Sequence, residues 1–405
     1  MLFAGIAIFV LGSEVLFWLW AHRRLGRTRH HALWRTLLHT YMTFQSTGFI
    51  LIFLQRVFNI VADLPTLALA AIYLWHILIL PFTTVCLALG YLFSAFSFQS
   101  GKKGDASHFS ASDSSTKPEP TRRELLLAGA TAIPPLLTGV TVATAMMQLN
   151  DLRVREFTIP LPSLPPNLDG LTIAHVSDTH VGRFTYGQKL KNISDITNSL
   201  RCDLVLLTGD LIDYSLHDLP DAIEMVKRMD PRSGLFLCQG NHDCFQSRDQ
   251  FDAGVRAAGL TLLSNQSVHL RIRNQAVQIF GTRWPIPEDY LPRSTKDAAV
   301  YNYIPALAAE RDPDAFPILM AHHPHAFDPA AACGFPITLA GHTHGGQLML
   351  TDNIGAGPIF YRYWSGLYTK PNGSATVISN GVGNWFPLRT HAPAEIIKIT
   401  LRCQT

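Results

Sequence analysis

The chain has 405 residues, of which 47% are hydrophobic and 16% are charged, and its mean hydropathy is +0.14. This length predicts two or three domains and excludes a small disulfide-stabilised module, while the low charge content excludes a disordered chain and favours membrane segments. Residues 1–149 carry 11 basic and 6 acidic side chains, whereas residues 150–405 are slightly acidic. Because the basic residues flank apolar runs, they indicate orientation in a membrane rather than nucleic-acid binding.

The first part of the chain, residues 1–96, is predicted to be a bundle of about three transmembrane helices. Three apolar runs, at 2–21, 37–55 and 64–96, are long enough to cross the hydrocarbon layer, which takes about 20 helical residues. An arginine cluster follows the first run instead of preceding it, the reverse of the order in a cleavable signal peptide. The third run is longer than a crossing needs and is interrupted by Pro81 and Gly90.

A polar segment and a fourth apolar run come next. Residues 97–123 are rich in Ser, Lys, Asp, Pro and Gly, a composition typical of a flexible linker. Residues 124–147 follow an Arg-Arg pair and predict either a fourth transmembrane helix or an export-signal-like segment. A small-residue triplet near the end of this run resembles a cleavage site, so both interpretations stay open.

The basic residues between the apolar runs predict an orientation. Five arginines separate the first two runs, one separates the second from the third, and five Lys or Arg separate the third from the fourth. Loops rich in Lys and Arg stay in the cytoplasm, so the first and third loops are expected there. We therefore expect a multi-pass protein of the inner or plasma membrane, with the rest of the chain extracytoplasmic if the fourth run crosses and cytoplasmic if it does not.

Residues 150–402 have the pattern of a globular α/β domain. Short apolar runs end in Gly, Asp, Asn or His, and several stretches between them have helical spacing. The runs read LTIAHVSDTH, CDLVLLTGD, GLFLCQGNHD, AVQIFGTRW, FPILMAHHP and FPITLAGHTH. Because ligands bind at strand ends in layered α/β folds, we expect these six ends to converge on one site.

Seven side chains at these strand ends carry metal-binding atoms: Asp178, His180, Asp210, Asn241, His322, His342 and His344. Carboxylate oxygens, imidazole nitrogens and an amide oxygen suit Mn²⁺, Fe or Zn²⁺, and seven ligands are too many for one ion that keeps an open position. We therefore expect two divalent ions, with Mn²⁺ favoured. Two such ions repel each other strongly, and an acidic bridge such as Asp210 together with a bridging hydroxide would reduce this repulsion. The same hydroxide would be the nucleophile.

The motifs DTH, GD, GNHD, a His before a Pro, and GHTHGGQ, in this order, resemble the calcineurin-like metallophosphoesterase superfamily. GHTHGGQ resembles its membrane-attached or exported bacterial phosphodiesterase branch. The resemblance covers residues 150–402 and implies a two-sheet β-sandwich flanked by helices, in four layers of the order α/β/β/α. It also implies a division of the ligands: Asp178, His180 and His344 on the first metal, Asp210 bridging, and Asn241, His322 and His342 on the second.

The resemblance implies catalytic roles for two further residues. His242 would protonate the leaving-group oxygen or stabilise the charge of the transition state, and Asp213 would orient His242. Asp243 is open between a partner of the site residues and a surface turn residue. Trp364, Trp385 and Phe386 are open between holding a lipid or nucleoside and ordinary packing.

Other histidines are expected to lie outside the ligand set. The sequence HHPH offers three histidines, and the family pattern places the ligand two residues before Pro324, at His322. His323 and His325 are then expected to pack beside the site, and His175 to be a hydrogen-bonded core residue. The six cysteines contain no CxxC pair and are expected to be mainly core thiols.

These observations predict a membrane-anchored, metal-dependent phosphoesterase acting on a phosphodiester or pyrophosphate. The expected partners are the lipid bilayer and a small-molecule or lipid-linked phosphoester, and no nucleic acid. An alternative is a membrane receptor or accessory protein whose phosphoesterase-like domain binds its ligand without turnover. A protein phosphatase ranks low, because GDLID and GNHDC lack the arginines that such enzymes use to bind phosphate.

Overall fold

The computed structural model describes residues 2–26, 31–58, 64–99, 122–149, 151–285 and 296–404. The chain forms two compact units, Met1–Thr144 and Ala145–Thr405. Most of the expected linker, residues 100–121, lies outside the described residues, while its two ends belong to helices. We describe each unit by itself.

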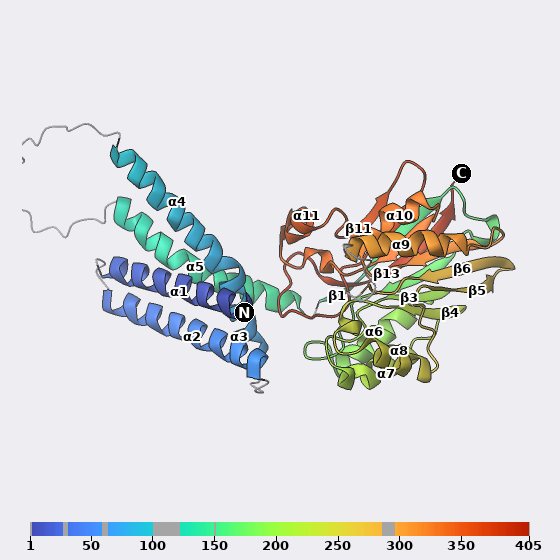
Figure 1. Cartoon of the computed structure of the whole chain (residues 1–405), viewed down its shortest axis with the longest axis horizontal. Coiled ribbons are helices and arrows are strands. Elements are labelled where there is room, and N and C mark those ends of the chain that lie inside the picture. Colours follow the sequence, from blue (N-terminus) through green and yellow to red (C-terminus); the bar gives the residue numbers. More distant parts are fainter. Residues whose placement is uncertain are drawn as a thin grey trace, which may run out of the picture. The chain divides into compact units, whose positions relative to one another are not determined.

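Unit 1 consists of long helices (Figure 1). They are α1 (Leu2–Leu25), α2 (His31–Phe58), α3 (Thr66–Leu74), α4 (Leu80–Gln99) and most of α5 (Arg122–Gln148). Among the described residues, two stretches are long and apolar enough to cross a membrane, His31–Leu54 and Thr66–Leu89. These stretches overlap the second and third apolar runs predicted above.

The third apolar run forms one continuous helical segment rather than a broken one. A π-helical turn, η1 (Trp75–Ile79), joins α3 to α4, and the Leu80 N–H donates to the Trp75 carbonyl. Pro81 follows directly and has no N–H, so it removes the α-helical bond to the carbonyl of Ile77. A single wider turn of this kind is how a helix accommodates such a defect without ending.

Unit 2 contains two main sheets and one small hairpin. The first sheet has the order β1-β13-β2-β3-β4: Leu152–Leu161, Ala394–Cys403, Thr172–Val176, Leu204–Thr208 and Gly234–Cys238. The second has the order β11-β12-β8-β7-β6-β5: Gly366–Thr369, Ala375–Ile378, Ile337–Ala340, Phe316–Met320, Gln275–Gly281 and Gln266–Ile272. The hairpin pairs β9 (Met349–Thr351) with β10 (Ile354–Gly355).

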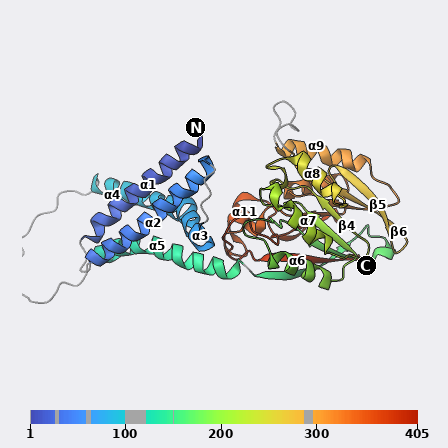
Figure 2. The ribbon, with the colours of Figure 1, turned by 90° about the horizontal axis from the view of Figure 1, so that it is seen from below.

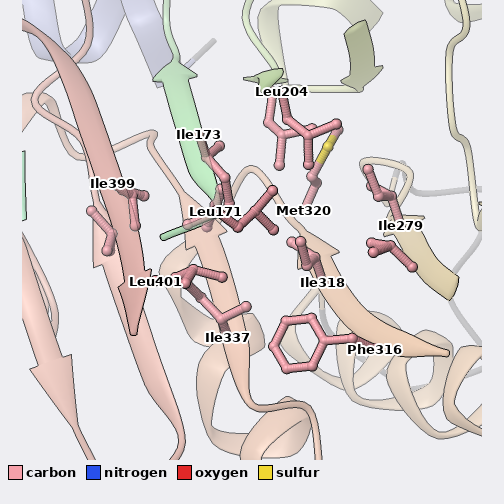
Figure 3. Packing of buried hydrophobic residues seen from close by; sticks show 14 of the residues in the cluster. Leu171, Ile173, Leu204, Ile279, Phe316, Ile318, Met320, Ile337, Ile399 and Leu401 are labelled. Carbon is pink, nitrogen blue, oxygen red and sulfur yellow. The ribbon is translucent and has the colours of Figure 1, made fainter. Parts of the chain in front are cut away.

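The two sheets pack face to face through one apolar core. Ile173 and Leu204 from the first sheet and Ile318 and Ile337 from the second are fully buried in it (Figure 3). Burying a side chain of this size stabilises the fold by about 1.5–3 kcal/mol. Successive strand residues point to opposite faces, and both faces are covered, which is why these strands read as unbroken apolar runs.

Helices cover the outer faces of both sheets. On the first sheet lie α6 (Gln188–Ser199), α7 (Leu219–Lys227) and α8 (Arg248–Ala257), whose buried residues pack against the second faces of β2 and β3. On the second sheet lie α9 (Lys296–Ala309) and α10 (Phe327–Ala332). Figure 1 shows the helices on the two outer sides, and Figure 2 looks onto the side that carries α6, α7 and α8. The predicted four-layer α/β/β/α sandwich is confirmed.

Candidate metal centre

All seven predicted ligands lie on loops that leave the carboxyl ends of five strands. These strands are parallel within their sheets, β2 with β3 and β4, and β7 with β8, so their carboxyl ends meet at one edge. Asp178 and His180 follow β2, Asp210 follows β3, Asn241 follows β4, His322 follows β7, and His342 and His344 follow β8. The structure brings them together in two groups that meet at Asp210.

The first group contains Asp178, His180 and His344, all of them buried. The Nε2 atoms of His180 and His344 are 3.0 Å apart. The Oδ1 atom of Asp178 lies 3.4 Å from Nε2 of His344 and 3.9 Å from Nε2 of His180. Three donor atoms from two loops therefore point at one another, as ligands of a single ion do.

The second group contains Asn241, His322 and His342. Nδ1 of His342 lies 2.9 Å from Oδ1 of Asn241 and 3.1 Å from Nε2 of His322. Nε2 of His322 lies 3.1 Å from the same Asn241 oxygen. His342 thus faces the group with its Nδ1 atom and His322 with its Nε2 atom.

Asp210 lies between the two groups. Its Oδ2 atom is 3.5 Å from Nε2 of His180 in the first group and 3.2 Å from Nε2 of His322 in the second. Its Oδ1 atom accepts a hydrogen bond of 2.8 Å from the His242 N–H. One carboxylate oxygen therefore faces both groups, the position that a bridging ligand occupies.

The chemistry of the donor atoms fits a cation. Nδ1 of His322 lies 2.7 Å from the Thr208 carbonyl, which only accepts, so Nδ1 carries the hydrogen. In the neutral ring Nε2 then has a lone pair, and it faces the oxygens of Asn241 and Asp210, which are also acceptors. Burial lowers the pKa of His322, but the charges of Asp210 and Asp178 outweigh it and raise the pKa to about 9. This group of acceptors needs a proton or a metal ion between them.

The backbone of the ligand loops is strained. Asp178, His180, Asp210, His342 and His344 all have φ between 43° and 70°, in the left-handed region. For a residue with a Cβ this region costs on the order of 1–2 kcal/mol. Such strain persists only where the surrounding structure enforces it, and it gathers at functional sites. Five of the seven predicted ligands share it.

Asp243 is a buried partner of the ligand loops and not a surface turn residue. Its carboxylate accepts hydrogen bonds from the backbone N–H groups of Gly240 at 2.9 Å, Asp210 at 3.0 Å and Leu211 at 2.8 Å. Burial and the neighbouring Asp210 raise the pKa of Asp243 to about 7. The side chain fixes the loop after β3 against the loop after β4, and so holds Asp210 in place.

His242 and Asp213 are in contact at the edge of the two groups. Nδ1 of His242 lies 2.5 Å from the backbone carbonyl oxygen of Asp213 and 3.4 Å from the Oδ1 atom of the same residue. This Oδ1 atom also lies 3.5 Å from Nδ1 of His180. Burial lowers the pKa of His242, but the charge of Asp210 and the contacts with Asp213 outweigh it and raise the pKa to about 9. At neutral pH His242 is therefore an imidazolium whose Nδ1 proton is held by Asp213.

Arg389 is a site residue that the sequence analysis missed. Its guanidinium group is fully buried, and the Nη2 atom donates to Nδ1 of His344 at 3.0 Å and to the Gly383 carbonyl at 2.6 Å. The Nη1 atom donates to the Asn380 and Ala392 carbonyls, at 2.9 Å each. Burial, His180 and Arg389 together lower the pKa of His344, so its ring is neutral, the form that binds metals. No motif surrounds Arg389, so the sequence contained no signal for it.

Trp284 was also missed, although its strand end had been identified. Its ring lies 5.5 Å from that of His322 and 5.4 Å from that of His342, between ring centroids. The ring of His323 lies 4.5 Å from that of His342, so His323 packs beside the ligands as expected. His175 is the expected core histidine: it is fully buried, contacts Thr208 Oγ1 at 2.8 Å, and burial lowers its pKa to about 3.

The aromatic residues near the carboxyl end differ in their surroundings. Trp385 is 44% exposed, and its ring centroid lies 6.1 Å from that of His242 and 6.4 Å from that of His344. Trp364 instead packs on Tyr368. Cys202 and Cys238 are the core thiols that were expected, whereas Cys86 is exposed and the other three are partly exposed.

Comparison with known proteins identifies the domain that carries these residues. A model of the calcineurin-like phosphoesterase domain matches residues 171–346. A transmembrane protein with a metallophosphoesterase domain from Danio rerio is 28% identical over 263 residues, which are 62% of this chain and 57% of that protein. The UDP-2,3-diacylglucosamine pyrophosphatase of Chlamydia trachomatis is 25% identical over 300 residues, 64% of this chain and 91% of that enzyme.

A solved structure, the phosphopantetheinyl hydrolase of Mycobacterium tuberculosis, overlaps with 54% of this chain and 91% of its own, at 13% identity and a TM-score of 0.34. The chain spans little more than half the length of the Danio rerio protein. The two apolar stretches of unit 1 and the transmembrane relative together indicate association with a membrane. From the match over residues 171–346 and these relatives, unit 2 contains a calcineurin-like phosphoesterase domain.

Proposed function

We propose that this protein is a membrane-anchored, metal-dependent phosphoesterase that hydrolyses a phosphodiester or a pyrophosphate. The observation that carries the proposal is the position of Asp210, whose Oδ2 atom faces a histidine of each ligand group at 3.5 Å and 3.2 Å. A single-ion site does not need a carboxylate shared between two sets of ligands, whereas a pair of ions needs one because the two positive charges repel each other.

The proposed ligands of the first ion are Asp178, His180 and His344, and those of the second are Asn241, His322 and His342, with Asp210 shared. Oxygen and nitrogen donors of this kind suit Mn²⁺, which we favour over Fe and Zn²⁺. When bound, two such ions supply positive charge for the phosphoryl oxygens and lower the pKa of a coordinated water to about 7.

His242 is the proposed proton donor. Its Nδ1 proton is held by Asp213 at 2.5 Å, which leaves the second proton of the imidazolium on Nε2. Its pKa of about 9 keeps that proton in place at neutral pH. Because an alkoxide is a poor leaving group, a proton delivered from Nε2 to the departing oxygen lowers the barrier to cleavage.

The anchor and the substrate class extend the same proposal. We assign residues 1–96 to a multi-pass anchor, 97–123 to a linker, 124–147 to a fourth crossing and 150–402 to an extracytoplasmic catalytic domain. The similarity to a pyrophosphatase whose substrate is a diacylated sugar nucleotide supports a lipid-linked phosphoester over a freely soluble one. The alternative, a receptor that binds such a ligand without turnover, has the same ligand groups but needs neither His242 nor Asp213.

The test of the enzyme is hydrolysis of bis(p-nitrophenyl) phosphate by the purified full-length protein loaded with Mn²⁺. Asp210→Asn removes the shared charge and is expected to lower turnover by about 100-fold or more. Asp314→Asn is the matched control, because Asp314 is exposed and precedes the amino end of β7, whereas His322 follows the carboxyl end of that strand. Equal turnover by the wild type and Asp210→Asn would contradict the proposal, and ligand binding without turnover would favour the receptor.

The sidedness is tested separately by a reporter fused after Thr405. An active periplasmic or extracellular reporter is expected, because four crossings with the arginine-rich loops inside place this end outside the cytoplasm. A reporter active only in the cytoplasm would show that residues 124–147 do not cross.

A further inference from the structure

Unit 2 exposes five large apolar side chains on the end of a long helix and on two short elements, and we call these five residues the apolar rim. They are Met147 in the last turn of α5, Leu350 and Ile354 on the β9–β10 hairpin, and Ile359 and Phe360 on α11 (Ala356–Phe360). Their exposed fractions are 83%, 74%, 59%, 74% and 73%. Single exposed apolar residues are common, but a concentration of this kind indicates an interaction surface.

The end of α5 is fixed to the loop that follows the second sheet. The His391 N–H donates to the side-chain oxygen of Gln148 at 2.9 Å, and the Asn384 side-chain amide donates to the Leu149 carbonyl at 3.1 Å. Met147 is the residue before Gln148, so this loop, residues 384–391, determines where Met147 lies in unit 2.

The same loop also holds the hairpin, which in turn contacts α11. The Met349 N–H donates to the Thr390 carbonyl at 3.1 Å, and the Gln347 side-chain amide donates to the Phe386 carbonyl at 3.1 Å. The Gly357 N–H of α11 contacts Sδ of Met349 at 3.4 Å. The three elements of the apolar rim are therefore held on one loop, and Figures 1 and 2 show α11 at the end of unit 2 where β1 begins.

We propose that the apolar rim lies in the interface of the lipid bilayer and presents the metal centre to a phosphoester whose apolar part stays in the membrane. The proposal rests on the proposed function, in which α5 crosses the bilayer. Only residues 149–151 separate the end of α5 from the start of β1, so unit 2 begins at the membrane surface. Exposed apolar side chains at that level are buried by lipid, which favours the bilayer over any soluble partner as occupant.

Trp385 connects the apolar rim to the metal centre. It belongs to the loop that holds the apolar rim, and its ring lies 6.1 Å from that of His242, between centroids. An aromatic ring with a polar N–H is suited to the boundary between lipid and water. A lipid whose acyl chains stay in the bilayer would thus have its headgroup beside the proposed proton donor.

Photo-crosslinking tests the occupant independently of catalysis. A benzophenone amino acid replaces Phe360 or Ile359 in the full-length protein, reconstituted in dioleoylphosphatidylcholine vesicles, and adducts are identified by mass spectrometry. The control position is His269, exposed on β5, which Figure 1 shows at the opposite end of unit 2 from α11. We expect lipid adducts at 359 and 360, at about tenfold the yield at 269 or more. Equal yields, or adducts between two copies of the chain in place of lipid, would overturn the proposal.

Substrate preference tests the consequence for catalysis. We compare hydrolysis of dioleoylphosphatidyl-p-nitrophenol in the same vesicles with hydrolysis of bis(p-nitrophenyl) phosphate, which has the same leaving group. In the double variant Ile359→Asp/Phe360→Asp, we expect the ratio of turnover on the vesicle substrate to turnover on the soluble substrate to fall by about tenfold or more. The control double variant Gln266→Asp/His269→Asp is expected to leave this ratio unchanged. An unchanged ratio in the rim variant overturns the proposal. If wild type cleaves neither substrate, the proposed function fails, and the lipid adducts alone decide whether the rim contacts the bilayer.

Discussion

At the scale of single residues, Arg389 shows how a buried cation positions a metal ligand. Its planar guanidinium group has five N–H donors and forms hydrogen bonds with His344 and several backbone carbonyls at once. A lysine ammonium group cannot reproduce this planar arrangement of donors. We expect Arg389→Lys to weaken metal binding by about 10–100-fold, because supporting hydrogen bonds to ligands have effects of this size. Metal content after dialysis against graded Mn²⁺ measures the change.

The control for this substitution is Arg402→Lys. Arg402 pairs with Asp169 at 2.9 Å on the surface, where both side chains are about half exposed. The same chemical change there is expected to leave metal content as in wild type. If Arg389→Lys also retains its metal, the hydrogen bond to His344 has no part in positioning that ligand.

Asp213 makes a prediction about pH. Burial lowers the pKa of His242, but the charge of Asp210 and the contacts of Asp213 outweigh it and raise the pKa to about 9. The proton that His242 would donate is therefore present at neutral pH and is lost as the pH rises through this value. Asp213→Asn removes a negative charge and lowers this pKa, and the alkaline limb of kcat therefore moves to lower pH. The profile should be measured with a diester that has an alkoxide leaving group, since such a substrate needs the proton. An alkaline limb in the same place as in wild type would remove His242 from the role of acid.

At the scale of elements, the loop after β8 can approach the loop after β2 because Gly341 has no side chain. A Cβ on Gly341 would collide with Oγ of Ser177 and Oδ2 of Asp178. We expect Gly341→Ala to displace Asp178 and lower turnover by about 100-fold, because displacements of about 1 Å at a reacting centre have effects of this size. Circular dichroism should show that the fold is retained.

Gly259→Ala is the matched control for Gly341→Ala. Gly259 has φ of +80° but no atom within 4 Å of the added Cβ, so the change introduces backbone strain and no collision. It is expected to cost about 1–2 kcal/mol of stability and no activity. Equal activity of the two variants would mean that β2 and β8 tolerate separation at the site.

The sequence predicted the elements of unit 2 better than the details of its site. The apolar runs at β2, β3, β4, β7 and β8 were readable because both faces of these strands are buried. The convergence of Asp178, Asp210 and His342 followed from parallel strand ends. The left-handed φ of these residues was not predictable, because it comes from packing between loops rather than from local preference. Arg389 was missed for a related reason: the carbonyls it satisfies adopt their positions only in the folded loop.

At the scale of the whole molecule, metal ions are expected to stabilise one unit and not the other. All seven proposed ligands belong to unit 2. A ligand at 100 times its dissociation constant stabilises the state that binds it by about 2.7 kcal/mol. Adding Mn²⁺ to the full-length protein should therefore slow hydrogen exchange in β2, β3 and β8 and leave α1 and α2 unchanged. Slowing in both units, or in neither, would contradict this expectation.

The order of strands in the first sheet couples the beginning of unit 2 to its end. β13 lies between β1 and β2. It pairs with β1 over Leu152–Leu161 along one of its edges and with β2 along its other edge. In this sheet β13 is the only described strand that pairs with β1, so β1 has no partner until β13 has been synthesised. A chain without β13 leaves one edge of β1 and one edge of β2 unpaired, and such edges promote aggregation. The first sheet can therefore be completed only after the whole segment between Leu161 and Ala394 has been made.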